Sequence, residues 1–299
     1  MVLPASLRML ARVLVVATAT LAVSCGNSDQ GAQITVGAGD SVESAVLAEI
    51  YAGALARIGT RTSVQPHSGS RTDYLAALDA GRIDLIGEHN GALLGFLDTT
   101  ATDRAPDLDK VPTALSKSLP EGLVVTDAAD GTDMRPRVVL SAEAATHDNV
   151  RTVGDLTPRC GTLTVGVASV PDLIALPPAS EQVADCHFAA TVPFPDAAAL
   201  RKALLDGQVH AGLLTGPPAL VPGATDGLTI LSDDKYAVRT ENVVPLFRKG
   251  TLDERQIKKL NYVAGELTTD DLAKMIRDVR DDHAKPAEVA RVWLDDHSL

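Results

Sequence analysis

Histidine, cysteine and serine are the residues of this sequence that could do chemistry, and none stands in a catalytic pattern. The seven histidines are scattered, and no two are spaced as metal ligands. The sequence has no G-x-S-x-G elbow, no phosphate-binding glycine loop and no H-E-x-x-H motif. We therefore expect a protein that is not an enzyme and that needs no cofactor and no metal.

The first of the three cysteines, Cys25, stands at the end of an export signal. Two arginines precede an apolar run at 13–23, which is too short to span a bilayer, so we predict a signal peptide over residues 1–24. The run ends in Leu21-Ala22-Val23-Ser24-Cys25, which resembles a bacterial lipobox, whose cysteine is acylated after cleavage. The alternative is an ordinary secretory signal in which Cys25 is incidental.

If the chain is exported, the residues after the signal peptide lie outside the cytoplasm. Residues 25–33 are rich in small and polar side chains and read as a lipidated, flexible tether. The protein is then expected on the extracytoplasmic face of the cell membrane. In an oxidising compartment the other two cysteines, Cys160 and Cys186, favour a disulfide.

The net charge and the composition limit the classes of molecule that the protein could bind. The net charge is -12, which argues against binding nucleic acid, because the phosphate backbone would repel it. The chain has 299 residues with 45% hydrophobic and 22% charged, which is ordinary for a globular protein of about two domains.

The elements that must position any site alternate between strands and helices from residue 34 onward. This alternation predicts βαβ units and an α/β fold with mostly parallel sheets flanked by helices. The predicted strands are 34–36, 60–64, 83–86, 123–125, 137–140 and 228–231, and the predicted helices are 41–58, 72–80, 252–267, 269–279 and 286–294.

Two segments of the chain resemble each other and indicate two lobes of one plan. Residues 77–85 and 203–211 both read as a helix end, a glycine and a strand. Glycine- and proline-rich stretches then suggest where the chain crosses between lobes. We expect an outer lobe from residues 34–126 and 226–299, and a middle lobe from residues 127–225.

Several segments resemble the osmoprotectant (glycine betaine, choline, carnitine) substrate-binding proteins of ABC importers. The middle lobe matches that family only in its strand-helix rhythm, whereas the outer lobe carries sequence matches. These are Ile34-Thr35-Val36-Gly37, Glu43, Leu47-Ala48-Glu49-Ile50-Tyr51, Gly69-Ser70, Ala77-Leu78, Gly81, Ile83-Asp84-Leu85, Glu88, Gly91, Leu231-Ser232-Asp233-Asp234-Lys235, Pro245-Leu246-Phe247-Arg248 and Leu267-Thr268-Thr269-Asp270-Asp271-Leu272.

The resemblance implies a two-lobed, type II periplasmic-binding-protein-like fold whose cleft closes on a small-molecule solute. It also implies an ABC permease as partner, and we expect a monomer. The family's aromatic cage for a quaternary ammonium is largely missing here. His89 and Glu241 stand where tyrosines are expected, and Ser41 and Ser44 replace a phenylalanine and a glutamine. An amine, polyol or sugar-like ligand therefore suits the site better than betaine.

The candidate ligand-binding residues are Ser41, Ser70, Arg71, His89, Asn90 and Glu241. All of them except Asn90 have a structural alternative. Ser41 and Ser70 could cap helices, His89 could face solvent in a loop, and Glu241 could be a surface charge. Arg71 could meet a ligand carboxylate, or could form a salt bridge with Asp73 or Asp84.

The sequence therefore predicts a lipid-anchored solute-binding protein that delivers a small polar solute, an osmoprotectant-like amine or a related compound, to an ABC importer. The alternative function is a lipoprotein of the same fold that has lost transport and acts as a scaffold or sensor partner.

Overall fold

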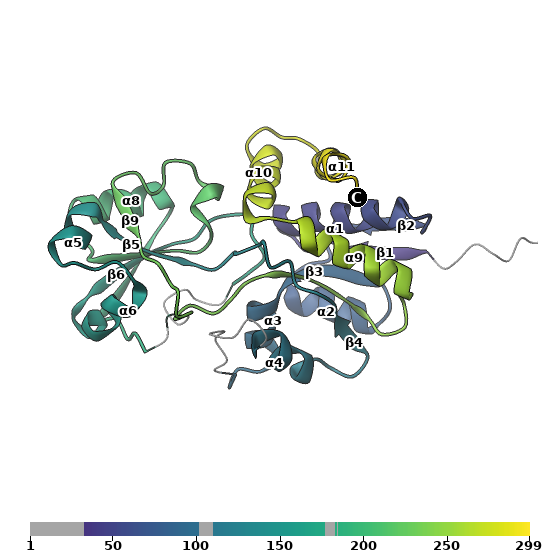
Figure 1. Cartoon of the computed structure of the whole chain (residues 1–299), viewed down its shortest axis with the longest axis horizontal. Helices are drawn as coiled ribbons and strands as arrows, with labels where there is room; N and C mark the ends of the chain where they lie inside the picture. Colours follow the sequence, from purple (N-terminus) through teal and green to yellow (C-terminus); the bar gives the residue numbers. More distant parts are fainter. Residues whose placement is uncertain (1–32, 102–109, 177–182, 184) are drawn as a thin grey trace, which may run out of the picture. The chain divides into compact units, whose positions relative to one another are not determined.

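A computed structural model describes residues 33–101, 110–176, 183 and 185–299 of the chain (Figure 1). The predicted signal peptide, Cys25 of the predicted lipobox and nearly all of the predicted tether lie outside these residues. Within the described residues, no helix is both long enough and apolar enough to span a membrane.

The first sheet has five strands in the order β2-β1-β3-β10-β4. Three of them, β1, β2 and β3, are parallel, and β10 runs antiparallel between β3 and β4. The strands are β1 (Ile34–Gly37), β2 (Thr62–Gln65), β3 (Leu85–His89), β4 (Leu123–Val125) and β10 (Val243–Arg248).

The second sheet repeats this plan in the order β7-β6-β8-β5-β9. Here β6, β7 and β8 are parallel, and β5 runs antiparallel between β8 and β9. The strands are β5 (Arg137–Ser141), β6 (Thr164–Ala168), β7 (Ala190–Phe194), β8 (Ala211–Leu214) and β9 (Leu228–Ile230). The expected two-lobed α/β fold is confirmed.

The internal similarity of the sequence falls on equivalent places of the two sheets. Residues 77–85 lead from the end of α2 (Arg71–Asp79) into β3, and residues 203–211 lead from the end of α8 (Ala197–Leu205) into β8. Each strand takes the third place in its sheet. Gly81 and Gly207 have φ of 67° and 70°, a left-handed conformation that only glycine adopts without strain.

The segment at 228–231, which we had expected in the outer lobe, belongs to the second sheet. Leu228, Thr229 and Ile230 pair with Ser141, Leu140 and Val139 of β5. The chain therefore returns to the first sheet after β9 rather than at residue 226.

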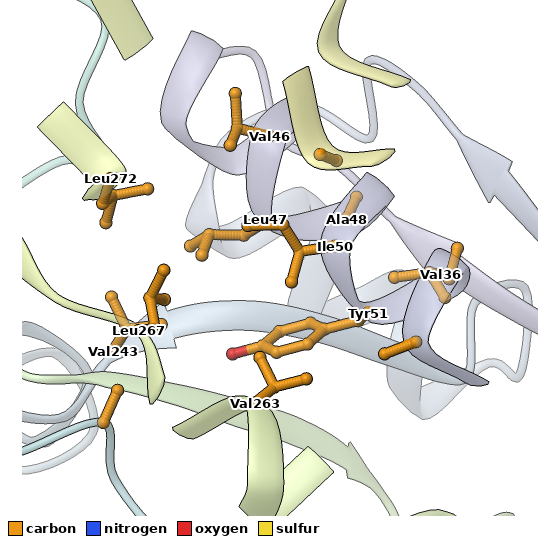
Figure 2. Packing of buried hydrophobic residues seen from close by; sticks show 14 of the residues in the cluster. Val36, Val46, Leu47, Ala48, Ile50, Tyr51, Val243, Val263, Leu267 and Leu272 are labelled. Atoms are coloured by element: carbon orange, nitrogen blue, oxygen red, sulfur yellow. The ribbon is translucent and has the colours of Figure 1, made fainter. Parts of the chain in front are cut away.

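Helices cover both faces of the first sheet. One face packs on α1 (Val42–Ala56), α9 (Glu254–Glu266), α10 (Thr269–Arg280) and α11 (Pro286–Asp296), and the other on α2, α3 (Asn90–Leu97) and α4 (Lys110–Ser118). Helix α1 is buried on most sides, because Val46, Leu47 and Ile50 are enclosed by neighbouring elements (Figure 2).

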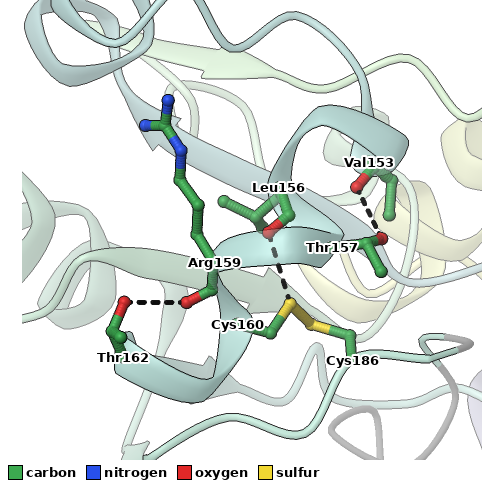
Figure 3. The surroundings of a disulfide bond; sticks show 7 residues. All are labelled: Val153, Leu156, Thr157, Arg159, Cys160, Thr162 and Cys186. Carbon is green, nitrogen blue, oxygen red and sulfur yellow. Dashed lines mark hydrogen bonds between the residues drawn. A yellow bond between two sulfur atoms is a disulfide. The ribbon is translucent and has the colours of Figure 1, made fainter.

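The second sheet is likewise covered on both faces. Its helices are α5 (Ala142–His147), α6 (Val153–Leu156) and the 3-10 helix η1 (Thr157–Thr162) on one face, and α8 on the other. The expected disulfide joins Cys160 of η1 to Cys186, with their Cα atoms 5.3 Å apart (Figure 3). It closes a stretch of chain that contains β6.

Candidate functional site

Polar residues gather where β3 ends and α3 begins. Glu88, His89 and Asn90 lie at this junction, and all three are buried, with exposures of 0%, 0% and 1%. Strand β10 runs antiparallel beside β3, so that Val243 lies opposite His89 and Glu241 comes close to the same junction. The N-terminal turn of α1 adds Glu43, which is also 0% exposed. We call Glu43, Arg71, Glu88, His89 and Glu241 the charged cluster.

His89 and Glu43 form the first pair of the charged cluster. The His89 Nε2 atom lies 2.8 Å from Glu43 Oε1. Burial alone would lower the pKa of His89, but the carboxylates of Glu43, Glu241 and Glu88 raise it above its ordinary value. The buried carboxylates around His89 therefore favour its protonated form, which would make it the cation of a buried ion pair with Glu43. His89 is not the solvent-facing loop residue of the structural alternative.

Glu43 also connects to the segment that follows β6 of the second lobe. Its Oε2 atom accepts a hydrogen bond from the backbone N–H of Ile174 at 2.8 Å, and its own N–H donates to the Asp172 carbonyl at 3.0 Å. One carboxylate thus binds a side chain of the first lobe and the backbone of the second. The hydrogen bonds of Glu43 therefore depend on the distance between the start of α1 and the segment that follows β6.

Glu88 and Arg71 form the second pair. Arg71 donates from Nε and Nη2 to the two Glu88 oxygens at 2.7 and 2.9 Å, and the Tyr74 hydroxyl donates to Glu88 as well. Burial raises the pKa of Tyr74, and the charge of Glu88 adds to this effect. The Arg71 guanidinium also lies over the ring of Phe96 at 5.9 Å. Arg71 therefore pairs with Glu88, and not with Asp73 or Asp84 as the structural alternative supposed.

Glu241 has only half of its carboxylate satisfied. Its Oε2 atom accepts from the Ala92 N–H at 2.7 Å, in the first turn of α3, where the helix dipole favours a negative charge. Its Oε1 atom is buried and has no hydrogen-bond partner among the described residues. Burial raises the pKa of Glu241 to about 7, against the opposing charges of His89, Arg239 and Arg71. With an exposure of 1%, Glu241 is not a surface charge.

Three of the six sequence-predicted residues lie in the charged cluster, namely Arg71, His89 and Glu241. Asn90 lies beside it and pairs with Asn242, whose N–H donates to Asn90 Oδ1 at 3.0 Å. The Ser41 hydroxyl caps α1 by accepting from the Ser44 N–H at 3.1 Å. The Ser70 hydroxyl donates to Asp73 at 2.6 Å at the start of α2.

Sequence reasoning did not single out Glu43 and Glu88 as site residues. Glu88 directly follows an apolar strand, and Glu43 lies in the first turn of a helix whose other residues are mostly apolar. An acidic residue in such surroundings was the available signal. Their burial, however, depends on contacts with segments far away in the chain.

The charged cluster brings several charged and hydrogen-bonding groups to one place. It contains three carboxylates, one guanidinium and one imidazole. The carboxylates and the imidazole are buried and the Arg71 side chain is 10% exposed, so their charges interact more strongly than they would in water. Among the residues that the structure describes, no group of three histidine, cysteine or acidic side chains could hold a metal ion. The cluster lies at the strand ends of one of two sheets built on the same plan, an arrangement typical of two-lobed solute-binding proteins.

Comparison with known proteins identifies the family. The family described as "Substrate binding domain of ABC-type glycine betaine transport system" matches residues 32–296. The chain therefore belongs to this family, whose members are extracytoplasmic substrate-binding proteins and not enzymes. They bind small solutes and work with an ABC permease. No curated protein matches the chain.

Solved structures show the same fold. A "glycine betaine/carnitine/choline ABC transporter" structure has a TM-score of 0.65 at 18% identity and covers 89% of this chain and 98% of its own. Apo YehZ from Escherichia coli has a TM-score of 0.64 at 19% identity, with coverages of 89% and 99%. An ABC-transporter choline-binding protein in complex with choline has a TM-score of 0.50 at 14% identity and covers 89% of each chain.

Proposed function

We propose that this chain is a lipid-anchored solute-binding protein that captures a small polar solute, an osmoprotectant-like amine or a related compound, and delivers it to an ABC permease. The charged cluster is the observation that carries this proposal. Burying four ionisable groups beside the largely buried Arg71 costs free energy, and apolar residues in their place are often neutral or stabilising. A stability role alone therefore explains the cluster poorly, and a polar ligand explains it well.

Lobe closure is the proposed means of capture. Glu43 lies in the first lobe and accepts from the Ile174 N–H of the second, so a solute that pairs with the cluster also acts on the contact between the lobes. A solute that binds the closed form better than the open form shifts the population toward closure. The permease would then receive a closed, loaded monomer.

Acylation at Cys25 is the proposed anchor. Replacing this residue, as Cys25→Ala, should move the protein from the detergent phase to the aqueous phase in a Triton X-114 partition of whole cells. The Cys160→Ala variant serves as the control, because its cysteine takes part in the disulfide and it should stay in the detergent phase. An aqueous wild-type protein would exclude the anchor.

A thermal-shift screen tests the solute-binding function. The mature protein, stripped of bound solute by unfolding and refolding, is screened against amines, amino acids, polyols and sugars. A ligand at one hundred times its Kd stabilises the native state by about 2.7 kcal/mol and raises the melting temperature. If no compound raises it, the scaffold or sensor function becomes the better account of the chain.

A further inference from the structure

Two buried polar atoms of the charged cluster have no partner among the described residues, and they differ in kind. They are Nδ1 of His89 and Oε1 of Glu241, in side chains that are 0% and 1% exposed. Glu241 lies two residues before Val243, the residue that pairs with His89 across β3 and β10. An unpaired polar atom in such a place is costly, so each points to a partner other than the residues that the structure describes.

One of these atoms is a donor and the other an acceptor. His89 places Nε2 2.8 Å from Glu43, and the carboxylates of Glu43, Glu241 and Glu88 favour the protonated ring, in which Nδ1 is a donor. Glu241 uses Oε2 for the Ala92 N–H, which leaves Oε1 as an acceptor in the ionised form that a cationic partner favours. The partner must therefore offer an acceptor to His89 and a hydrogen to Glu241.

We propose that the solute is a small zwitterion whose cationic nitrogen carries at least one hydrogen, as in an amino acid. Its ammonium donates to Glu241 Oε1, and its carboxylate accepts from His89 Nδ1. This inference rests on the proposed function and narrows the solute to one chemical class.

A fully methylated ammonium fits this pair of atoms poorly. It has no hydrogen to donate, so Glu241 Oε1 would remain buried and unpaired. It is bound best by open aromatic faces. Two aromatic residues near the cluster are already engaged, because the Tyr74 hydroxyl bonds to Glu88 and the Phe96 ring faces Arg71.

Two methylation series test the inference by isothermal titration of the full mature chain. The first is glycine, sarcosine, dimethylglycine and glycine betaine, and the second is proline, N-methylproline and proline betaine. Within each series the carboxylate stays the same and only the N–H hydrogens are lost. We expect the amino acid of at least one series to bind at least tenfold more tightly than its betaine.

The other outcomes separate this inference from the function on which it rests. A betaine that binds as tightly as its amino acid, or more tightly, overturns the inference and leaves solute binding intact. If neither series binds while another compound of the thermal-shift screen does, the inference is again overturned and the function stands. If nothing binds in either experiment, both fail.

The variant Glu241→Gln tests the residue assignment. It keeps an acceptor for the Ala92 N–H but removes the charge, so the preference for the amino acid over its betaine should fall by at least fivefold. Glu266→Gln, on the exposed end of α9, should keep the full preference. An unchanged preference in Glu241→Gln would overturn the assignment.

A second readout covers the case in which Glu241→Gln does not fold. Pairing with an ammonium favours ionised Glu241, so at pH 7 the wild-type protein should release a fraction of a proton on binding the amino acid. Titration in buffers of different ionisation enthalpy measures this release. Binding without proton release would contradict the role of Glu241.

Discussion

The three glutamates of the charged cluster are held in three different ways. Glu88 has a bidentate arginine and a tyrosine hydroxyl, and Glu43 has a histidine and a backbone N–H. Glu241 has one backbone N–H at a helix start and one oxygen without a partner among the described residues. Each oxygen of Glu88 and Glu43 is therefore paired, whereas the Oε1 atom of Glu241 is left for the solute that we propose.

Because Glu241 lacks a second partner among the described residues, the stability of the solute-free protein should depend on pH. The pKa of Glu241 is about 7 in the folded state, against about 4.3 in an unfolded chain. The folded state then holds the extra proton between these values, so the stability that Glu241 contributes is full at pH 4 and is lost as the pH rises to 7. The loss amounts to about 3 kcal/mol. The raised pKa of His89 acts in the same direction at higher pH.

Urea unfolding at pH 5, 6, 7 and 8 measures this effect in wild type and Glu241→Gln. We expect the free energy of unfolding of the wild-type protein to fall across this range, and the fall in the variant to be smaller by about 3 kcal/mol. Glu266→Gln should follow the wild type. Parallel curves for Glu241→Gln and wild type would show that Glu241 is ionised throughout.

At the scale of elements, Gly91 allows α3 to approach the returning chain closely enough to bring Glu241 to Ala92. A Cβ atom at this position would lie 2.1 Å from the Thr240 carbonyl oxygen and 2.9 Å from Glu241 Oε1. No such contact is possible without a backbone shift. Glycine is therefore required here for the close approach of two backbones.

Gly91→Ala should destabilise the protein by about 1–3 kcal/mol and weaken solute binding, because the returning chain must move away from α3. The matched variant is Gly265→Ala in α9, where a Cβ would meet nothing within 4 Å. It should stabilise by about 0.5 kcal/mol through helix propensity. Chemical denaturation with parallel titration of the solute distinguishes the two. A neutral Gly91→Ala variant would contradict the close approach of α3 and the returning chain.

The disulfide stabilises the second lobe. It links positions 26 residues apart, and closing a loop of this length in the unfolded chain contributes about 3 kcal/mol. In the double variant Cys160→Ser and Cys186→Ser, hydrogen exchange of peptides from β6 and β7 should accelerate accordingly. Peptides from α1 provide the internal control and should change less. Unchanged exchange in β6 would show that the bond adds no stability.

The elements were largely predictable because their signals are local. Ser41 begins α1, apolar runs mark the central strands, and the repeated helix-glycine-strand segment places β3 and β8 equivalently. The membership of β9 was not predictable in this way. Its three residues pair with β5, about ninety residues earlier in the chain. The local sequence of a strand does not indicate which distant strand it will pair with.

The candidate site was predictable in part for the same reason. His89, Arg71 and Glu241 were chosen for their departure from an expected aromatic cage or for their place at a helix start, and the fold brings them together. The hydroxyls of Ser41 and Ser70 are used at helix starts, as their structural alternative held. Glu43 and Glu88 were missed, because a glutamate in a sequence does not reveal whether distant segments will bury it.

At the scale of the whole molecule, the chain carries the family's fold, with the charged cluster at the ends of strands in its first sheet. Val170, Ile174 and Leu220 of the second lobe belong to the same apolar cluster as Val46 and Leu47 of α1. The two lobes therefore share apolar contacts as well as the Glu43 hydrogen bonds. A solute that binds the charged cluster would change the strength of these contacts between the lobes. Solute binding would thereby shift the equilibrium between the open and closed forms.

Affinity for the solute that most raises the melting temperature tests the central claim most directly. Titration calorimetry would compare wild type with a His89→Gln and Glu241→Gln double variant whose melting curve shows that it is folded. If the charged cluster is the solute site, the double variant should bind at least one hundredfold more weakly. Affinities that agree within twofold would place the solute elsewhere and contradict the account.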